Sequence, residues 1–317
     1  NSQRYDVVRT TESMLKGFDN LEVGTLANPV DYLTVGGSLR DNGTVYAVEF
    51  GLTWNASLDI AHGTFTLTAP DDAFDVDVIL ADRNDPPARV DGHSLPKLGA
   101  GTLTLSAATT YTGSTDVQEG TLAAGAANVF SQSSQVSVAG GAELALNGYD
   151  QIAFNLTGSG SISLGGAKLT AENTASSEFS GSISGAGSIV KTGTGTLTLS
   201  GANSHSGGTT VSQGELAITR TDALGTGNVT LGNAGTLAIS LDTDGTLANR
   251  IAGTGSLRKT GAGDLTLTAA GSSAGEVTVA EGGLVFGQTG TFTARSYDVS
   301  ANSSTSIGPN AQLIVAG

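Results

Sequence analysis

The sequence predicts an all-β protein built as a β-solenoid, in which short strands stack as successive rungs of one coil. The first observation is an internal repeat without insertions, present at residues 97–122, 191–216 and 259–284. Each copy begins Lys-x-Gly-x-Gly and contains a Leu-Thr-Leu triplet, an alternation typical of a strand with one buried face. The second is composition: of 317 residues 46 are Gly, 14% are charged, and no segment has a sustained helical periodicity. One copy has too few apolar groups to bury a core alone, so the copies must stack on one another.

Residues 1–92 lack this repeat and predict a separate β-rich module. A weakly helical stretch at residues 11–16 comes first, and strand-like runs follow at residues 32–35, 44–54, 63–68 and 74–80. Asp41-Asn42-Gly43 separates two of these runs and is a strong hairpin signal. We therefore expect the module to be partly antiparallel.

The last of these runs has one apolar face and one acidic face. Alternation places Phe74, Val76, Val78 and Leu80 on one side, and Asp75 and Asp77 on the other. With Asp71 and Asp72 these acids gather four carboxylates near one strand, which we interpret as a charged face that discourages edge pairing. Five of the six prolines precede the first repeat, which places a domain boundary near residue 92.

Residues 93–317 are expected to form a parallel β-helix, with roughly ten rungs from residue 97 onward. Both leucines of each triplet should point into the core, and the threonine between them should point outward. The predicted inward leucines are Leu103, Leu105, Leu197, Leu199, Leu265 and Leu267. A glycine-marked turn and a second Val/Leu pair follow, so each copy reads as strand, turn, strand. The intervening segments repeat too, since residues 136–146 match residues 229–239.

The charge, the cysteine content and the hydropathy of the chain restrict its partners and its location. The net charge of −15 argues against nucleic acid and anionic membranes as partners. The chain has no Cys, which in a large extracellular protein suggests bacterial export without disulfides. No run approaches eighteen consecutive apolar residues and no signal segment opens the chain, so we expect neither a membrane span nor a precursor but a piece of a longer protein.

The repeat resembles a known family. The second copy is similar to the passenger-associated repeat of bacterial autotransporters in the segment Lys191-Thr-Gly-Thr-Gly-Thr-Leu-Thr-Leu-Ser-Gly-Ala-Asn203. In the first copy, Tyr111 supplies the aromatic residue of that repeat. His205 in the second copy and Ser273 in the third replace the aromatic residue, and Asp264 in the third copy replaces the usual Thr. Residues 31–82 also resemble a segment found upstream of this repeat in such passengers.

The resemblance implies a right-handed parallel β-helix with an N-terminal β-rich module. It also implies a location on the cell surface of a Gram-negative bacterium, anchored to the outer membrane or secreted. The membrane-embedded translocator of such proteins is not expected within these residues, so we expect no membrane insertion by them. Family members include adhesins, self-association and biofilm proteins, and in some branches enzymes or toxins, so the fold does not decide the function.

Few residues suggest chemistry. Ser273 matches Gly-x-Ser-x-Gly but falls within the repeat's turn rather than between a strand and a helix. His62, His93 and His205 are scattered, without the spacing of a zinc site, and we expect His205 in a surface turn. Asp242-Thr-Asp244-Gly245 offers oxygen ligands suited to calcium but lacks the other positions of a calcium loop, which favours a solvated turn. We therefore expect no catalytic, cofactor-binding or metal-binding residues.

Two functional hypotheses remain, neither of them enzymatic. The first is adhesion or self-association through polar β-helix faces, with a host-cell or matrix receptor, a glycan or a second copy as partner. The alternative is a passive β-helical stalk that presents an upstream functional or enzymatic domain. Tyr46, Trp54 and the acidic face at residues 71–77 could supply a specific contact, although we favour the interpretation that the two aromatic residues fill the core of their own module.

Overall fold

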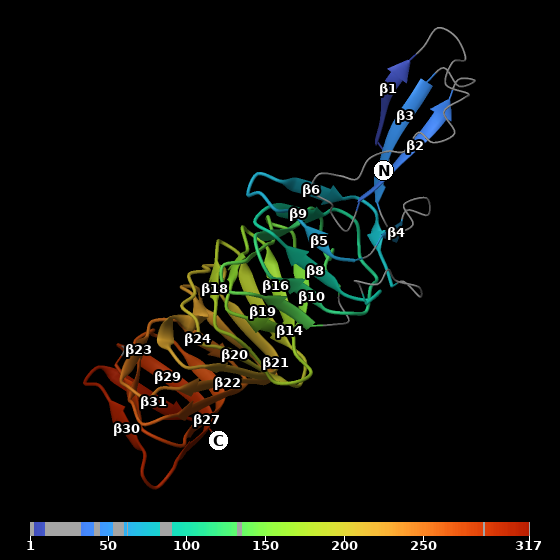
Figure 1. Ribbon diagram of the computed structural model, residues 1–317. Coiled ribbons are helices and arrows are strands. Elements are labelled where there is room, and N and C mark those ends of the chain that lie inside the picture. Colours follow the sequence, from blue (N-terminus) through green and yellow to red (C-terminus); the bar gives the residue numbers. More distant parts are fainter. Residues whose placement is uncertain are drawn as a thin grey trace.

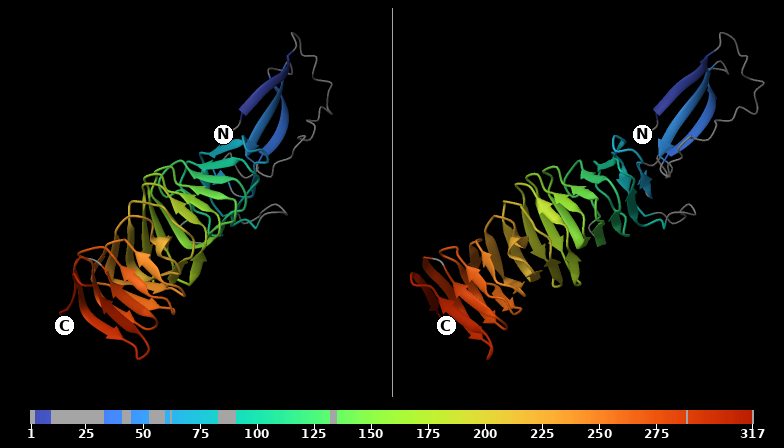
Figure 2. Two further views of the ribbon diagram at one scale, coloured as in Figure 1. Left: turned by 90° about the vertical axis from the view of Figure 1, so that its left-hand side faces the viewer. Right: turned by 60° about the vertical axis from the view of Figure 1, so that its left-hand side comes forward.

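The protein is an elongated β-solenoid with a small antiparallel sheet at its N-terminal end (Figures 1 and 2). The computed structural model describes residues 3–9, 33–40, 45–52, 60–61, 63–82, 91–131, 135–287 and 289–316. The coil has about 11 rungs, and no α-helix occurs in these ranges. The predicted all-β parallel solenoid is therefore confirmed, and its right-handed sense stays a prediction.

Three strands form the N-terminal sheet in the order β1-β3-β2, with both pairings antiparallel. They are β1 (Gln3–Arg9), β2 (Leu33–Arg40) and β3 (Val45–Leu52). The pairing of β2 with β3 agrees with the hairpin signal between them, while residues 41–43 themselves lie outside the described residues. The predicted helical stretch at residues 11–16, His62 and Trp54 also lie outside them.

Parallel pairing begins before the expected boundary at residue 92. β4 (Ile60–Ala61) pairs in parallel with β7 (Ile79–Leu80), and β6 (Ala73–Val76) pairs in parallel with β9 (Thr102–Leu105). The change from antiparallel to parallel pairing thus lies between β3 and β4. Phe65 pairs directly with Lys97, so Pro70 and Pro96 belong to one long rung, whereas Pro29, Pro86 and Pro87 lie outside the described residues. The division of the chain into two domains stays a prediction.

The longest sheet has 16 strands and follows nearly the whole coil. Its strands are β5 (Phe65–Thr66), β8 (Leu95–Leu98), β10 (Thr115–Val117), β12 (Gln135–Val138), β14 (Gln151–Gly158), β16 (Lys168–Glu172), β17 (Ser177–Phe179), β19 (Ser188–Thr192), β20 (Thr196–Leu199), β21 (Thr209–Ile218), β22 (Val229–Ser240), β24 (Ile251–Gly253), β25 (Ser256–Thr260), β27 (Ser273–Val279), β29 (Gly290–Val299) and β31 (Ala311–Val315).

Two shorter sheets form further faces of the coil. One has six strands, in the order β18-β15-β13-β11-β9-β6, and the other has four, in the order β23-β26-β28-β30. Their strands are β11 (Thr121–Ala124), β13 (Glu143–Ala145), β15 (Ser161–Ser163), β18 (Ser182–Ser184), β23 (Gly245–Leu247), β26 (Leu265–Leu267), β28 (Gly283–Phe286) and β30 (Ser304–Ile307), with β6 and β9 as above. A 3₁₀ turn, η4 (Thr221–Leu224), is the one helical element in the part of the chain that the structure describes.

The core is a stack of aliphatic side chains in parallel register. Leu103 pairs with Leu122, and the same column continues through Leu144, Ile162 and Ile183. All six leucines of the triplets are at most 2% exposed, which confirms their inward orientation. Such columns form because each rung repeats the path of the one before it, and each rung therefore buries its neighbour's apolar face.

We expect Leu199→Ala to lower the free energy of unfolding by about 2–5 kcal/mol, because it opens a cavity in a fully buried column. Thr198→Ala changes the neighbouring half-buried position on the outer side of β20 and should cost within about 0.5 kcal/mol. Denaturant titration of both variants measures the difference. Equal losses at the two positions would show that the faces of β20 are reversed.

Candidate functional site

The lysine that opens each repeat lies in the core, although sequence analysis assigned it no role. Lys97, Lys191 and Lys259 are 0% exposed. Each Nζ donates to three backbone carbonyl oxygens: two on its own rung and one 22 residues downstream. The Nζ–O distances are 3.0, 2.7 and 3.0 Å for Lys97 (Leu98, Gly99, Glu119), 2.6, 2.9 and 3.2 Å for Lys191 (Thr192, Gly193, Gln213), and 2.7, 2.8 and 3.3 Å for Lys259 (Thr260, Gly261, Glu281).

This carbonyl cage explains the spacing Lys-x-Gly. Gly99, Gly193 and Gly261 have φ of 73°, 74° and 78°, a conformation that non-glycine residues rarely adopt. A Cβ at Gly99 would lie 2.2 Å from the carbonyl oxygen of Leu67 on the preceding rung. Burial lowers the pKa of Lys97 and of Lys191 to about 8, so both stay charged at neutral pH. An ammonium group with three donors matches three carbonyl acceptors, which makes the cage a structural element of the repeat.

The aromatic position of the repeat is also buried, so the expected surface turn at His205 is wrong. His205 is 0% exposed, and its Nε2 lies 2.9 Å from Oγ1 of Thr209. Tyr111 in the first copy makes the same contact, with its hydroxyl 2.5 Å from Oγ1 of Thr115. Both threonines are buried at the start of a core strand. Each therefore offers a buried hydrogen-bond partner to the side chain four residues earlier, Tyr111 or His205. Burial lowers the pKa of His205 to about 4, so the ring is neutral at pH 7.

The third copy replaces both members of this pair. Ser273 stands at the aromatic position and Val277 stands where the other copies have Thr. Ser273 begins strand β27, and its Oγ accepts from the backbone N–H of Gly253 at 3.4 Å. A strand position with this partner is not the strand-to-helix turn of a hydrolase nucleophile.

The remaining sequence candidates are separate surface residues. His93 is exposed, with its Nδ1 3.4 Å from Oδ1 of Asp82. Asp244 is exposed, and its Oδ1 accepts from the backbone N–H of Asp264 at 2.8 Å. The acids at residues 71, 72, 75 and 77 are all exposed, and Oδ1 of Asp75 accepts from Oγ of Ser106 at 2.6 Å. Among the described residues no three His, Cys, Asp or Glu side chains gather as metal ligands would.

A continuous polar column, which we call the outer ladder, follows one side of the coil from β20 to β29. Direct parallel pairing stacks its six members. They are Thr196, Glu215, Thr236, Ser256, Glu276 and Ser296. All are half-buried or exposed, and the four hydroxyl groups form no side-chain hydrogen bond within the described chain. Glu215 pairs diagonally with Arg258 through Oε2 and Nη2, 2.5 Å apart.

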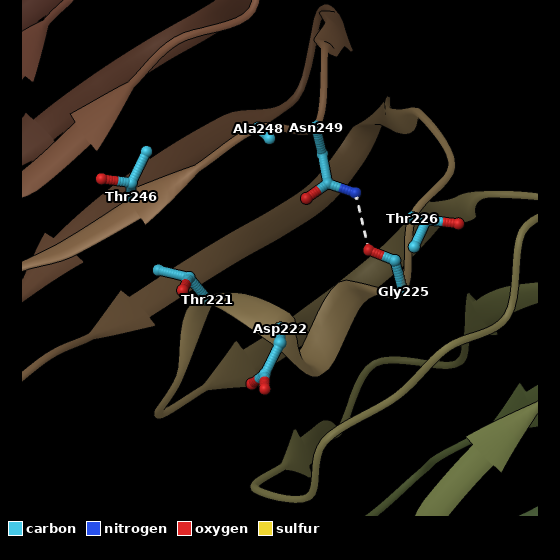
Figure 3. Close-up of a pocket in the computed structure, with 7 residues that line it drawn as sticks. All are labelled: Thr221, Asp222, Gly225, Thr226, Thr246, Ala248 and Asn249. Atoms are coloured by element: carbon cyan, nitrogen blue, oxygen red, sulfur yellow. Dashed lines mark hydrogen bonds between the residues drawn. The ribbon is translucent and has the colours of Figure 1, made fainter.

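One pocket interrupts the regular stack at η4. It lies between this 3₁₀ turn and the next rung, has a volume of about 270 Å³ and is lined by Thr221, Asp222, Gly225, Thr226, Thr246, Ala248 and Asn249 (Figure 3). Asn249 reaches back across the rungs, and its Nδ2 donates to the carbonyl oxygens of Gly225 and Gly227 at 3.0 and 2.6 Å. This pocket could not be predicted from the sequence, because the residues that line it come from two rungs.

Comparison with known proteins identifies the repeat. The passenger-associated-transport-repeat family matches residues 95–124, 189–218 and 257–286. The adhesin BmaC autotransporter of Brucella suis biovar 1 (strain 1330) is 34% identical over 318 residues, an alignment that covers 88% of this chain. The chain spans about 9% of the length of that relative. No described segment is a helix long and apolar enough to cross a membrane.

We expect Lys191→Met to destabilise the protein by about 2–4 kcal/mol, because three buried carbonyl groups lose a charged donor. Lys168→Met is the matched control, since Lys168 and its partner Asp150 are half exposed and such pairs contribute about 0–1 kcal/mol. Denaturant titration at pH 7 compares them. A loss at Lys191 no larger than at Lys168 would contradict the structural role of the cage.

We expect His205→Tyr to remove part of the acid sensitivity of the protein. The unfolded chain protonates His205 near pH 6.5, whereas the folded chain does so near pH 4, so the wild type loses stability as the pH falls through this window. A tyrosine, as at position 111, keeps the hydroxyl partner without titrating there. The wild type should lose about 3 kcal/mol more than the variant between pH 7 and pH 4. Denaturant titrations at several pH values measure the free energy of unfolding of both proteins. An equal loss in the wild type and the variant would refute this expectation.

Proposed function

Because the chain is an autotransporter passenger region that carries passenger-associated transport repeats, we propose that it acts in adhesion or self-association at the surface of a Gram-negative bacterium. The relative with 34% identity is named an adhesin, which supports an adhesive role for this chain. The proposed partners are a host-cell or matrix receptor, a glycan or a second copy of the chain. The proposal involves no catalytic step.

The outer ladder is the observation that supports this proposal most. Its four hydroxyl groups share one line with the carboxylates of Glu215 and Glu276, Thr236 and Ser256 lie on consecutive rungs, and no hydroxyl is engaged by a neighbouring side chain of the described chain. Each could make one weak hydrogen bond to a partner. Because the rungs repeat, many such bonds can form at once, and multivalent contacts raise affinity far beyond that of a single contact.

The charge of the chain restricts the partner. At −15 the chain repels nucleic acid and anionic surfaces over the screening distance. A second copy would approach the outer ladder against this repulsion, so self-association should strengthen as salt is added. Binding to a neutral partner should depend little on salt.

The passive stalk remains the second candidate, and the relative's length favours it. The chain corresponds to about 9% of that protein, and a solenoid can extend without limit because each rung contacts only its neighbours. Under this alternative the outer ladder has no partner. A contact through Tyr46 or Trp54 in the N-terminal part likewise stays a prediction.

The test replaces outer-ladder hydroxyls in the full chain and measures association. We expect Thr236→Lys with Ser256→Lys to reduce aggregation of protein-coated beads, or their binding to cultured epithelial cells, by about tenfold. Thr102→Lys with Thr121→Lys is the matched control, because these residues pair in the same way on another sheet. Absence of binding by the wild type, or equal effects of the two double variants, would favour the stalk.

A further inference from the structure

We propose that the pocket beside η4 binds one neutral sugar residue of a glycan. This inference names a partner class for the adhesive role and rests on that proposed function for its biological setting. The pocket is where one rung departs from the regular stack, since η4 is a 3₁₀ turn and the following rung has the strand β23 beside the pocket instead (Figure 3). Its volume of about 270 Å³ lies just below the range of about 300–1,000 Å³ for drug-sized ligands, which suits a single small group.

Asn249 supplies a fixed hydrogen-bond acceptor at this site. The residue is 9% exposed, and the two carbonyl groups that accept from Nδ2 hold the amide plane in place. Its Oδ1 has no partner within the described chain and is not one of the fully enclosed unpaired atoms, so solvent or a ligand can reach it. In Figure 3 this oxygen faces the space between Asn249 and Thr221.

Hydroxyl groups and a carboxylate surround the acceptor. The hydroxyls of Thr221, Thr226 and Thr246 make no hydrogen bond within the described chain. Asp222 lines the pocket, and Arg220 binds its carboxylate through both Nε and Nη2. This pairing neutralises and orients Asp222 without enclosing it, since both side chains are about half exposed.

Two glycines set the position of the chain around the pocket. Gly225 ends η4 with φ of 66°, and a Cβ there would lie 2.3 Å from the carbonyl oxygen of His205. A Cβ at Gly245, at the start of β23, would come within 2.9 Å of the Thr221 side chain. A side chain at Gly245 would therefore displace Thr221, which lines the pocket, and one at Gly225 would separate the end of η4 from the backbone of His205.

These groups match the chemistry of a neutral sugar. A sugar hydroxyl both donates and accepts, so it pairs with the amide oxygen, the carboxylate and the threonine hydroxyls. The methyl groups of Ala248 and the threonines can pack on its C–H surfaces. The overall negative charge of the chain disfavours sulfated or acidic sugars. No aromatic ring lines the pocket, so a single sugar should bind with about millimolar affinity, and display on many chains would raise it.

The test uses the full chain and saturation-transfer NMR with neutral methyl glycosides of glucose, galactose, mannose, fucose and N-acetylglucosamine. We expect saturable binding of at least one. Ala248→Lys places a long side chain in the pocket and should weaken that binding by about tenfold or more. Ala262→Lys, at another exposed alanine outside the pocket lining, is the matched control and should leave it unchanged. Thr246→Val removes one hydroxyl at constant shape and should weaken binding several-fold.

Several outcomes would overturn the inference. They are no saturable signal from any glycoside, undiminished binding by Ala248→Lys, equal loss with Ala262→Lys, or binding of polar peptides but not of glycosides. Bead aggregation separates this inference from the proposed function. If outer-ladder variants abolish association while no glycoside binds, the pocket proposal fails and the adhesive role stands; glycoside binding without association supports the pocket alone.

Discussion

Close parallel stacking of successive rungs is the constraint on which the rest of this structure depends. Leu95 pairs with Thr115 and Ile189 with Thr209, so a rung takes 20 residues in both repeats. Backbone groups of each rung bond to the rungs before and after, which leaves no room for side chains where the chain turns a corner close to its neighbour. Gly193 shows the limit, since a Cβ there would lie 2.3 Å from the carbonyl oxygen of Asn173. The corner also turns carbonyl groups inward, and the buried ammonium of Lys191 satisfies them.

The fold could be predicted where the pattern is local and repeated. Alternation in the Leu-Thr-Leu triplets identifies the buried face, and Asp41-Asn42-Gly43 separates two strands that do pair as antiparallel neighbours. The start of parallel pairing could not be predicted, because β4 to β7 are two to four residues long and carry no repeat. Phe65 and Lys97 are paired although 32 residues apart, against 20 in the regular rungs, so a long excursion resembles a domain boundary in sequence.

His205 was predicted wrongly, and the repeat lysines were given no role, for a physical reason. Charged and ionisable side chains are rarely fully buried, so a lysine or histidine in a glycine-rich stretch suggests solvent exposure. The sequence does contain a signal of this burial, because two positions of the repeat change together in the third copy. Tyr111 and His205 each precede a threonine by four residues, whereas Ser273 precedes Val277, as expected if the two side chains contact each other in the core. The pocket at η4 had no such signal, since it forms only when two rungs with different paths meet.

The third carbonyl acceptor of each lysine shows that the sequence repeat extends over two rungs of the coil. The lysine lies on one rung and its last carbonyl partner, such as Glu119 or Gln213, lies at the start of the next. The family match runs from before the lysine to beyond that carbonyl in all three copies. The unit that the family model describes is therefore the connection between two rungs rather than a single rung. A duplication that keeps this segment intact therefore also keeps the lysine together with all three of its carbonyl acceptors.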